Sequence, residues 1–301
     1  MIGSAISCRQ LVKRYGHRRA LDGFSLEVPR GSVLGVVGDN GAGKTTWMMT
    51  VAGLLSLDGG EIDILGRGAF NAAVHSGRLA ILPQDSDLPL ECPVESLLYG
   101  YARLQGLSAS EARKSVVAML KAVNLADRAG ERVRSLSHGM RKRVMLAQCF
   151  LGEPEVVLLD EPLNGLDPTE SARMRMYIQS LRGKRTVVVS SHNLHDIEEM
   201  CTHVAVVAKG RVSRVGPVAT FTDVAHRVEY VLSAEPKELA ALEAALPGAT
   251  FSFDAAERRL VCTFVEGEVA MVNRVLLPLL LKEVEVLAVT PGQSLEQALL
   301  K

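Results

Sequence analysis

The chain has 301 residues, of which 48% are hydrophobic, and its mean hydropathy is positive. This length and this apolar content exclude a disordered chain and allow two folded domains. Lys plus Arg and Asp plus Glu both total 34, so the net charge is zero and the composition disfavours nucleic-acid binding.

The N-terminus, MIGSAISCRQ, lacks the basic start and the apolar stretch of a secretion signal. The longest apolar run, residues 275–281, is far shorter than the roughly 20 residues that a membrane span needs. We therefore expect a cytosolic chain that does not cross a membrane by itself. The cysteines form no C-x-x-C pair and are predicted to be reduced residues of the core: Cys8, Cys92, Cys149, Cys201 and Cys262.

Near-continuous apolar runs recur along the first part of the chain, with helix-like stretches between them. Such runs are typical of parallel strands that are buried on both faces, so this part is predicted to have an α/β fold. The runs are VLGVV (33–37), LAIL (79–82), VVLL (156–159), TVVV (186–189) and VAVV (204–207).

The first of these runs leads into GDNGAGKTT (38–46), which matches the signature of a phosphate-binding loop between a strand and a helix. The glycines at 38, 41 and 43 allow backbone N–H groups to turn inward around phosphate oxygens. A helix that begins near Lys44 adds its positive end, Lys44 reaches the outer phosphates, and Thr45 can bind Mg²⁺.

Between about residues 88 and 150 the strand pattern is absent and two segments, 95–106 and 110–124, are helix-like. The second is opened by Ser108 with Glu111 three residues later, which is a capping box. We interpret this region as a helical insertion in the α/β domain.

The run VVLL continues as DEP, which supplies two carboxylates. Neighbouring side chains of a strand point to opposite faces, so Asp160 and Glu161 can share a site only where the strand ends, and Pro162 favours an end there. Asp160 is predicted to hold Mg²⁺ through water, and Glu161 to act as the general base that activates water.

After Gly216-Pro217 the pattern changes. Strand-like and helix-like segments follow in the order β-α-β-β-α-β, which predicts a ferredoxin-like accessory domain over residues 217–301. The segments are VEYVL (228–232), a helix opened by Pro236, TFSF (250–253), RLVCTF (259–264), a helix-like run at 269–281 that Pro278 interrupts, and VEVLAV (284–289), after which Ser294 and Gln297 are expected to cap a last short helix.

Further motifs appear in the order and spacing of one large family: LPQ (82–84), LSHGMRKRV (136–144), NGLDP (164–168) and SSH (190–192). Together with the phosphate-binding loop and VVLLDEP, they resemble the ATP-binding subunit of ABC transporters over about residues 5–215. Met140 followed by Arg141 is similar to a variant common in the ABC-2 type export subfamily, and a tail ending like SLEQALLK also occurs there.

This resemblance implies a P-loop NTPase fold, with a RecA-like core, an N-terminal β subdomain and the helical insertion together forming an ATP-binding domain over residues 1–216. The accessory domain at 217–301 is open to three interpretations, namely dimer support, ligand sensing and packing alone. The implied function is ATP hydrolysis by a homodimer that encloses two MgATP and drives a separate membrane-spanning permease from the cytoplasmic face of the membrane.

The resemblance also implies roles for single residues. Tyr15 would stack on the adenine, with a half-buried strand tyrosine as the alternative, and the basic cluster 13–19 around it is interpreted as a solvated strand end. The nucleotide-binding residues of the loop would be Gly38, Asn40, Gly41, Gly43, Lys44, Thr45 and Thr46.

Two further polar side chains, Gln84 and His192, would complete the catalytic site around Glu161. Gln84 would touch the Mg²⁺ held by Thr45 and Asp160, and it would sense the membrane partner at the edge of the helical insertion. His192, after the strand 186–189, would contact the γ-phosphate.

The remaining motif residues would act across a dimer. Ser137 and Gly139 would open a helix toward the γ-phosphate bound by the other subunit, and Asp167 would contact that subunit. The alternatives are an ordinary capped helix after Ser137 and a helix-cap role for Asp167. His138 stands where the family most often has glycine, and whether it contacts nucleotide is open.

One alternative function is a soluble ABC-type ATPase that gates a protein assembly unrelated to transport. Neutral charge, a single nucleotide site and the lack of a coiled-coil insertion argue against it. A small-molecule kinase is also a poor fit because it would not need LSHGM.

Overall fold

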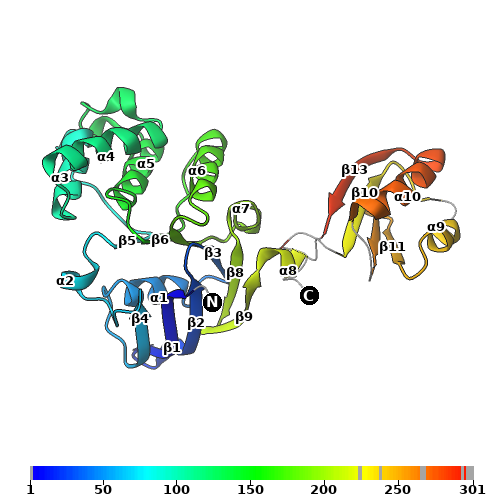
Figure 1. Cartoon of the computed structure of the whole chain (residues 1–301), viewed down its shortest axis with the longest axis horizontal. Helices are drawn as coiled ribbons and strands as arrows, with labels where there is room; N and C mark the ends of the chain where they lie inside the picture. Colours follow the sequence, from blue (N-terminus) through cyan, green and yellow to red (C-terminus); the bar gives the residue numbers. More distant parts are fainter. Residues whose placement is uncertain (1–2, 223–225, 237–238, 265–268, 293–294, 296–301) are drawn as a thin grey trace. The chain divides into compact units, whose positions relative to one another are not determined.

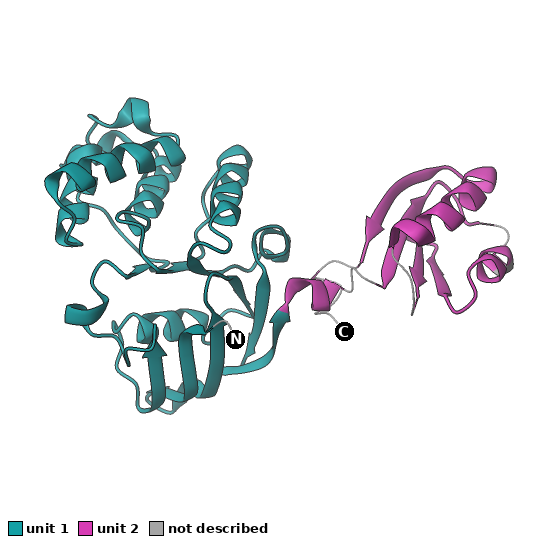
Figure 2. Cartoon of the chain, viewed as in Figure 1, with its two compact units in different colours: residues 1–216 teal, residues 217–301 magenta. Residues whose placement is uncertain are grey.

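The computed structural model describes residues 3–222, 226–236, 239–264, 269–292 and 295. The chain divides into two compact units, Met1–Gly216 and Pro217–Lys301, and each has its own hydrophobic core (Figure 2). The division falls where the sequence pattern changes.

The centre of the first unit is a six-stranded sheet, and every apolar run expected to be a strand lies in it. The strands β5, β6, β7, β3 and β8 run parallel to one another. The three strands in the middle, β6, β7 and β3, are buried along their whole length. The spatial order is β5 (Leu79–Leu82), β6 (Val156–Asp160), β7 (Thr186–Ser190), β3 (Val33–Val37), β8 (His203–Ala208) and β9 (Arg211–Pro217).

A second, antiparallel sheet has the order β2 (Arg18–Pro29), β1 (Ser4–Tyr15) and β4 (Gly59–Ile64). Helix α1 (Lys44–Val51) contacts both sheets, and its buried Trp47 stacks on Phe24 of β2 with ring centroids 5.5 Å apart. The two sheets and α1 therefore share one core, and the phosphate-binding loop at the start of α1 lies between them (Figure 1).

The insertion contains the helices α3 (Val94–Leu104), α4 (Ala109–Ala122) and α5 (His138–Cys149), with 3-10 turns at Ala126–Arg128 and Val133–Ser135. The three helices contact one another and gather together in Figure 1. The predicted capping box is confirmed, because Ser108 accepts from the N–H of Glu111 while the Glu111 carboxylate accepts from the N–H of Ser108.

The other helices of the first unit are α2 (Ala72–His75), α6 (Pro168–Ser180) and α7 (Leu194–Met200). Helices α6 and α7 each follow a strand of the central sheet and pack on each other, and α7 also packs on β3. Each is capped by the side chain of the preceding residue, Asp167 or Asn193.

The second unit begins with α8 (Val218–Thr222) and contains a four-stranded antiparallel sheet with two helices, α9 (Leu239–Ala245) and α10 (Val269–Glu283). The spatial order of its strands is β11 (Thr250–Asp254), β12 (Arg259–Thr263), β10 (Arg227–Leu232) and β13 (Val286–Pro291). This is the arrangement of a split βαβ unit.

One expectation for this unit was wrong in detail. Helix α10 is continuous through Pro278, which stands inside it, whereas the sequence predicted an interruption. Val272, Leu276 and Leu280 are buried along one face of α10, and this packing offsets the loss of one backbone hydrogen bond at the proline. The cap proposed for Ser294 and Gln297 lies outside the described residues.

In the part of the chain that the structure describes, no helix is both long and apolar enough to span a membrane.

Candidate nucleotide and catalytic site

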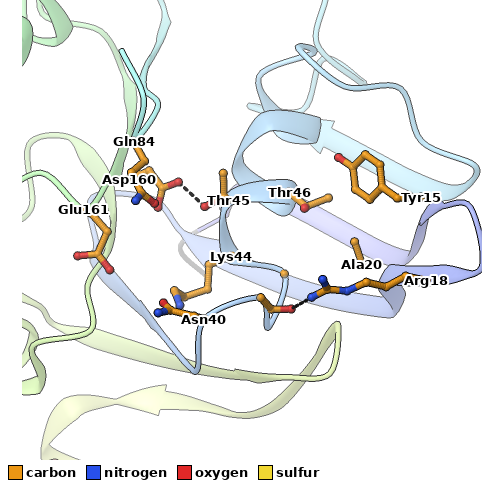
Figure 3. A pocket seen from close by; sticks show the side chains of 12 residues that line it. Tyr15, Arg18, Ala20, Asn40, Lys44, Thr45, Thr46, Gln84, Asp160 and Glu161 are labelled. Carbon is orange, nitrogen blue, oxygen red and sulfur yellow. Dashed lines mark hydrogen bonds between the residues drawn. The ribbon is translucent and has the colours of Figure 1, made fainter. Parts of the chain in front are cut away.

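A pocket of about 520 Å³ opens where the phosphate-binding loop meets the ends of β5 and β6 (Figure 3). It brings together residues from both sheets of the first unit and from the loop that follows β5. Its lining consists of Tyr15, Arg18, Ala20, Asn40, Gly41, Gly43, Lys44, Thr45, Thr46, Gln84, Asp160 and Glu161.

The loop itself is held in shape by Lys44. Lys44 is only 7% exposed, and its ammonium donates to the carbonyls of Gly38, at 2.6 Å, and Asp39, at 3.1 Å. Gly43 caps α1 with a φ of 116°, and a Cβ there would lie 2.6 Å from the carbonyl oxygen of Ala20, so only glycine fits. The loop thus presents a cation and the positive end of α1 to the pocket, which suits a phosphate.

Thr45 and Asp160 face each other across the floor of this pocket. The Thr45 hydroxyl donates to Asp160 Oδ2 at 2.5 Å, and the hydroxyl of Ser190 donates to the other oxygen of the same carboxylate. Asp160 is 1% exposed. Both of its oxygens are therefore fixed by hydroxyls, and its carboxylate is held beside the loop.

Glu161 follows the last residue of β6, as the expected strand end requires, and its φ of 49° is in the left-handed region. Its N–H donates to the Ser190 hydroxyl at 2.9 Å, which anchors the turn to β7. The turn brings the Glu161 side chain into the pocket beside Asp160 instead of onto the opposite face of the sheet. His192 Nδ1–H donates to Glu161 Oε2 at 3.0 Å, so the histidine holds the carboxylate rather than lining this pocket.

Two predicted residues lie exposed on the pocket wall. Tyr15 is the last residue of β1 with 49% of its surface exposed, which agrees with the alternative of a half-buried strand tyrosine, and its stacking on adenine stays a prediction. Its ring is free to stack on a planar base, and the ammonium of Lys13 lies 5.7 Å from the ring centroid. Gln84 follows the end of β5 and is also exposed.

Five predicted residues fall outside the pocket lining in the described part of the chain: Gly38, Ser137, Gly139, Asp167 and His192. Ser137 caps α5 by accepting from the N–H of Met140 at 3.3 Å, and Asp167 caps α6 by accepting from the N–H groups of Thr169 and Glu170. The capping alternatives are thus observed for both residues, and a contact with another subunit stays a prediction.

The starts of these two capped segments lie against each other. A Cβ on Gly139 would be 3.3 Å from the carbonyl oxygen of Gly165, and a Cβ on Gly165 would be 3.1 Å from the ring of His138. His138 therefore packs on the NGLDP segment of its own chain, and a contact with nucleotide stays an open prediction.

Sequence reasoning missed residues that reach the site from elsewhere. Ser190 orients both Asp160 and the turn at Glu161. Lys142 of α5 is 5% exposed; burial lowers its pKa, while the carboxylates of Asp160, Glu161 and Asp85 act in the opposite direction. Arg18 lines the pocket, although its basic cluster was expected only to be solvated. No local pattern distinguishes these residues from ordinary strand, helix and surface residues.

A phosphate-binding loop after β3, two carboxylates at the end of β6 and a histidine just after β7, the strand between these two, define an enzyme of the P-loop NTPase class. Comparison with known proteins refines this class. Residues 21–164 match the family model described as ABC transporter.

Curated relatives agree. The chain is 36% identical over 265 residues to Daunorubicin resistance ATP-binding protein DrrA3 of Streptomyces coeruleorubidus, covering 87% of this chain and 83% of the relative. It is 35% identical over 209 residues to Nod factor export ATP-binding protein I of Burkholderia orbicola (strain AU 1054), covering 68% of each.

Solved structures show the same fold. An ATP-binding subunit of an ABC transporter matches with a TM-score of 0.67 and 27% identity, over 73% of this chain and 92% of the other. An ATP-binding cassette in a dimeric, post-hydrolysis state with ADP and Pi matches with a TM-score of 0.65 and 20% identity, over 71% of this chain and 98% of the other.

The chain belongs to the ATP-binding subunits of ABC transporters, and its similarities group it with the ABC-2 export type. It is an ATP hydrolase whose turnover powers transport. Membership in this family implies a membrane permease as the partner.

Proposed function

We propose that this chain powers export as one half of a homodimer that binds two MgATP and drives a permease on a separate chain, from the cytoplasmic face of the membrane. The observation that carries the proposal is the pocket itself, in which Lys44 and Thr45 of the loop meet Asp160 and Glu161 of β6. The names of the relatives, which refer to drug resistance and Nod factor export, support the direction of transport.

The donor set fits Mg²⁺. The hydroxyl of Thr45 and the carboxylate of Asp160 are hard oxygen donors 2.5 Å apart, and the side chain of Gln84 lines the same pocket. Thr45, Asp160 and Gln84 would hold the ion, which would neutralise phosphate charge.

Water activation is assigned to Glu161. Glu161 lines the pocket and is 7% exposed, and its carboxylate accepts from His192, which keeps it oriented. General-base catalysis of this kind contributes about 10²–10⁴ in rate. His192 would contact the γ-phosphate when nucleotide is bound.

The dimer is supported by the family resemblance and by a motif residue that lies outside the pocket of its own chain. Ser137 opens α5, whose N–H groups favour an anion, yet it does not line the pocket of its own chain. A γ-phosphate that completes contacts with both subunits would favour a closed dimer, and its hydrolysis would remove those contacts.

The helical insertion, with Gln84 at its edge, is the surface assigned to the permease. The accessory unit at 217–301 is assigned a supporting role in packing or dimer formation, because its sheet and helices form a separate core and the nucleotide pocket lies wholly in the first unit.

The test is a pull-down of tagged Glu161→Gln protein from membranes of its source cell, in mild detergent, with and without MgATP. Recovery of a multi-span membrane protein that depends on MgATP supports the proposal and identifies the permease. Recovery of soluble proteins alone, with the chain absent from the membrane fraction, would favour the alternative of an ATPase that gates a different assembly.

A further inference from the structure

Arg18 reaches the phosphate-binding loop from the other side of the pocket. It is the first residue of β2, directly after the hairpin turn that follows Tyr15, and its side chain lies along the pocket wall toward the loop (Figure 3). No residue of the known site comes from this strand, apart from Ala20, which offers no polar side chain.

The contact between Arg18 and the loop is close and specific. Its Nη2 donates to the carbonyl oxygen of Gly41 at 3.0 Å, and a Cβ on Gly41 would lie 2.6 Å from the same nitrogen. The guanidinium therefore rests directly on the Gly41 backbone, whose φ is +79°. Glycine at position 41 is needed both for this backbone angle and for the approach of Arg18.

This contact holds one peptide group of the loop. In a trans peptide the C=O and the following N–H point in opposite directions, so an Arg18 that binds the Gly41 carbonyl turns the N–H of Ala42 the other way. That N–H donates to the carbonyl of Asp39 at 3.0 Å, and the same carbonyl accepts from Lys44 at 3.1 Å. Arg18 and Lys44 thus hold different carbonyl groups of the same loop, Arg18 that of Gly41 and Lys44 those of Gly38 and Asp39.

We propose that Arg18 is a positioning residue for nucleotide, which holds the phosphate-binding loop in its binding shape through the carbonyl of Gly41. A glycine-rich loop that is ordered before binding loses less conformational entropy when phosphate arrives, so the affinity rises. The guanidinium also adds a positive charge at the pocket edge, where it favours an anionic ligand.

The chain contains a matched control beside Arg18. Arg19 is the next residue of the same strand, but its guanidinium binds the carboxylate of Asp22 at 2.6 Å instead of the loop. Replacement of Arg19 removes an equal charge from the neighbouring position without removing the contact with Gly41.

The experiment measures MgATP binding by titration calorimetry, and KM and kcat by phosphate release, for the full-length wild type, Arg18→Met, Arg18→Lys and Arg19→Met. We expect Arg18→Met to raise the Kd and KM by about tenfold, the effect of a lost charge-assisted hydrogen bond, with kcat unchanged. Arg18→Lys, which keeps one donor and the charge, should recover part of the affinity, and Arg19→Met should match the wild type.

The inference rests on ATP binding at this pocket, and its failure is distinguishable from a failure of that function. A wild type that does not bind MgATP would contradict the function itself. A wild type that binds, together with an Arg18→Met variant of equal Kd, or an Arg19→Met variant that is equally weakened, would overturn only the role of Arg18. An Arg18→Met variant that loses kcat while its Kd stays the same would overturn it as well.

Discussion

Glu161 shows how much one backbone angle decides. Asp160 is the last residue of β6, and a regular strand would send the next side chain to the opposite face of the sheet. The left-handed φ of 49° at Glu161, anchored by Ser190, places both carboxylates on the wall of one pocket. A strained backbone of this kind persists where the surrounding structure holds it, and such positions cluster at active sites.

Glu161→Gln is expected to bind MgATP as the wild type does and to hydrolyse it at least about tenfold more slowly, because the amide cannot accept a proton from water. Phosphate release and calorimetry on the same preparation check both parts. Turnover equal to that of the wild type would remove Glu161 from the role of general base.

Lys44→Ala is expected to lose most of the affinity for MgATP. The ammonium now binds the carbonyls of Gly38 and Asp39, so its removal takes away a phosphate ligand and also frees the loop. Titration calorimetry gives the affinity directly, and a Kd equal to that of the wild type would contradict the assignment of the phosphate-binding loop.

At the scale of elements, a buried ion pair joins the helical insertion to α6. The Arg143 side chain of α5 donates to the carbonyls of Val123 and Asn124 and lies 3.4 Å from Glu170 Oε2 of α6. Asn124 donates to the other Glu170 oxygen at 2.9 Å. The middle of α5 and the turn after α4 therefore share one buried carboxylate of α6, so the insertion and the start of α6 are expected to move together.

Glu170→Ala should lower the free energy of unfolding by about 3 kcal/mol, because Arg143 would stay buried without a counter-charge. Chemical denaturation followed by circular dichroism measures the change. The control is Arg173→Ala, since Arg173 also lies 3.4 Å from Glu170 but its side chain is 46% exposed, and its loss should cost less than about 0.5 kcal/mol. Equal effects in the two variants would show that burial does not set the strength of the pair.

The reactivity of the cysteine thiols reports how well the helices and strands shield the core from solvent. Burial raises the pKa of Cys8 and Cys149 to about 12 and that of Cys262 to about 11, and it also raises the pKa of Cys201. At pH 8 these groups are protonated and covered, whereas Cys92 is partly exposed. Iodoacetamide at pH 8 should therefore label Cys92 well before the others, as peptide mass spectrometry would show, and rapid labelling of Cys149 would contradict the packing of α5.

At the scale of the whole molecule, the proposed function requires a second copy of the chain to complete each site. Ser137→Arg should abolish the ATP-dependent dimer of the Glu161→Gln protein, because a long charged side chain would stand where the facing subunit presents its nucleotide. Size-exclusion chromatography with MgATP gives the oligomeric state.

Ser108→Arg is the matched control, because Ser108 is also an exposed helix cap, at the start of α4. This variant should keep the dimer peak, since the loss of a cap alone costs only about 1 kcal/mol of stability. A dimer that survives in Ser137→Arg, or that is lost equally in Ser108→Arg, would argue against a contact between Ser137 and the other subunit.

By itself, the sequence determined the loop at 38–46, the strand end at Asp160 and the strands β3, β5, β6, β7 and β8 of the central sheet, whereas β9 carries no unbroken apolar run and was not predicted. These features are readable because strands buried on both faces need unbroken apolar runs, and because a phosphate-binding loop is encoded within a few adjacent residues. The capping box at Ser108 was also predictable, because its two residues, Ser108 and Glu111, lie only three positions apart.

Only the tertiary structure decided which distant side chains meet. The order β6-β7-β3 sets Ser190 and His192 beside the carboxylates, the antiparallel sheet carries Arg18 to Gly41, and the packing of α5 selects Lys142 to face Asp160. The path of α10 through Pro278 was likewise decided by its buried face. Such contacts depend on how separate elements pack, and local periodicity records only which face of each element is buried, not what lies against it.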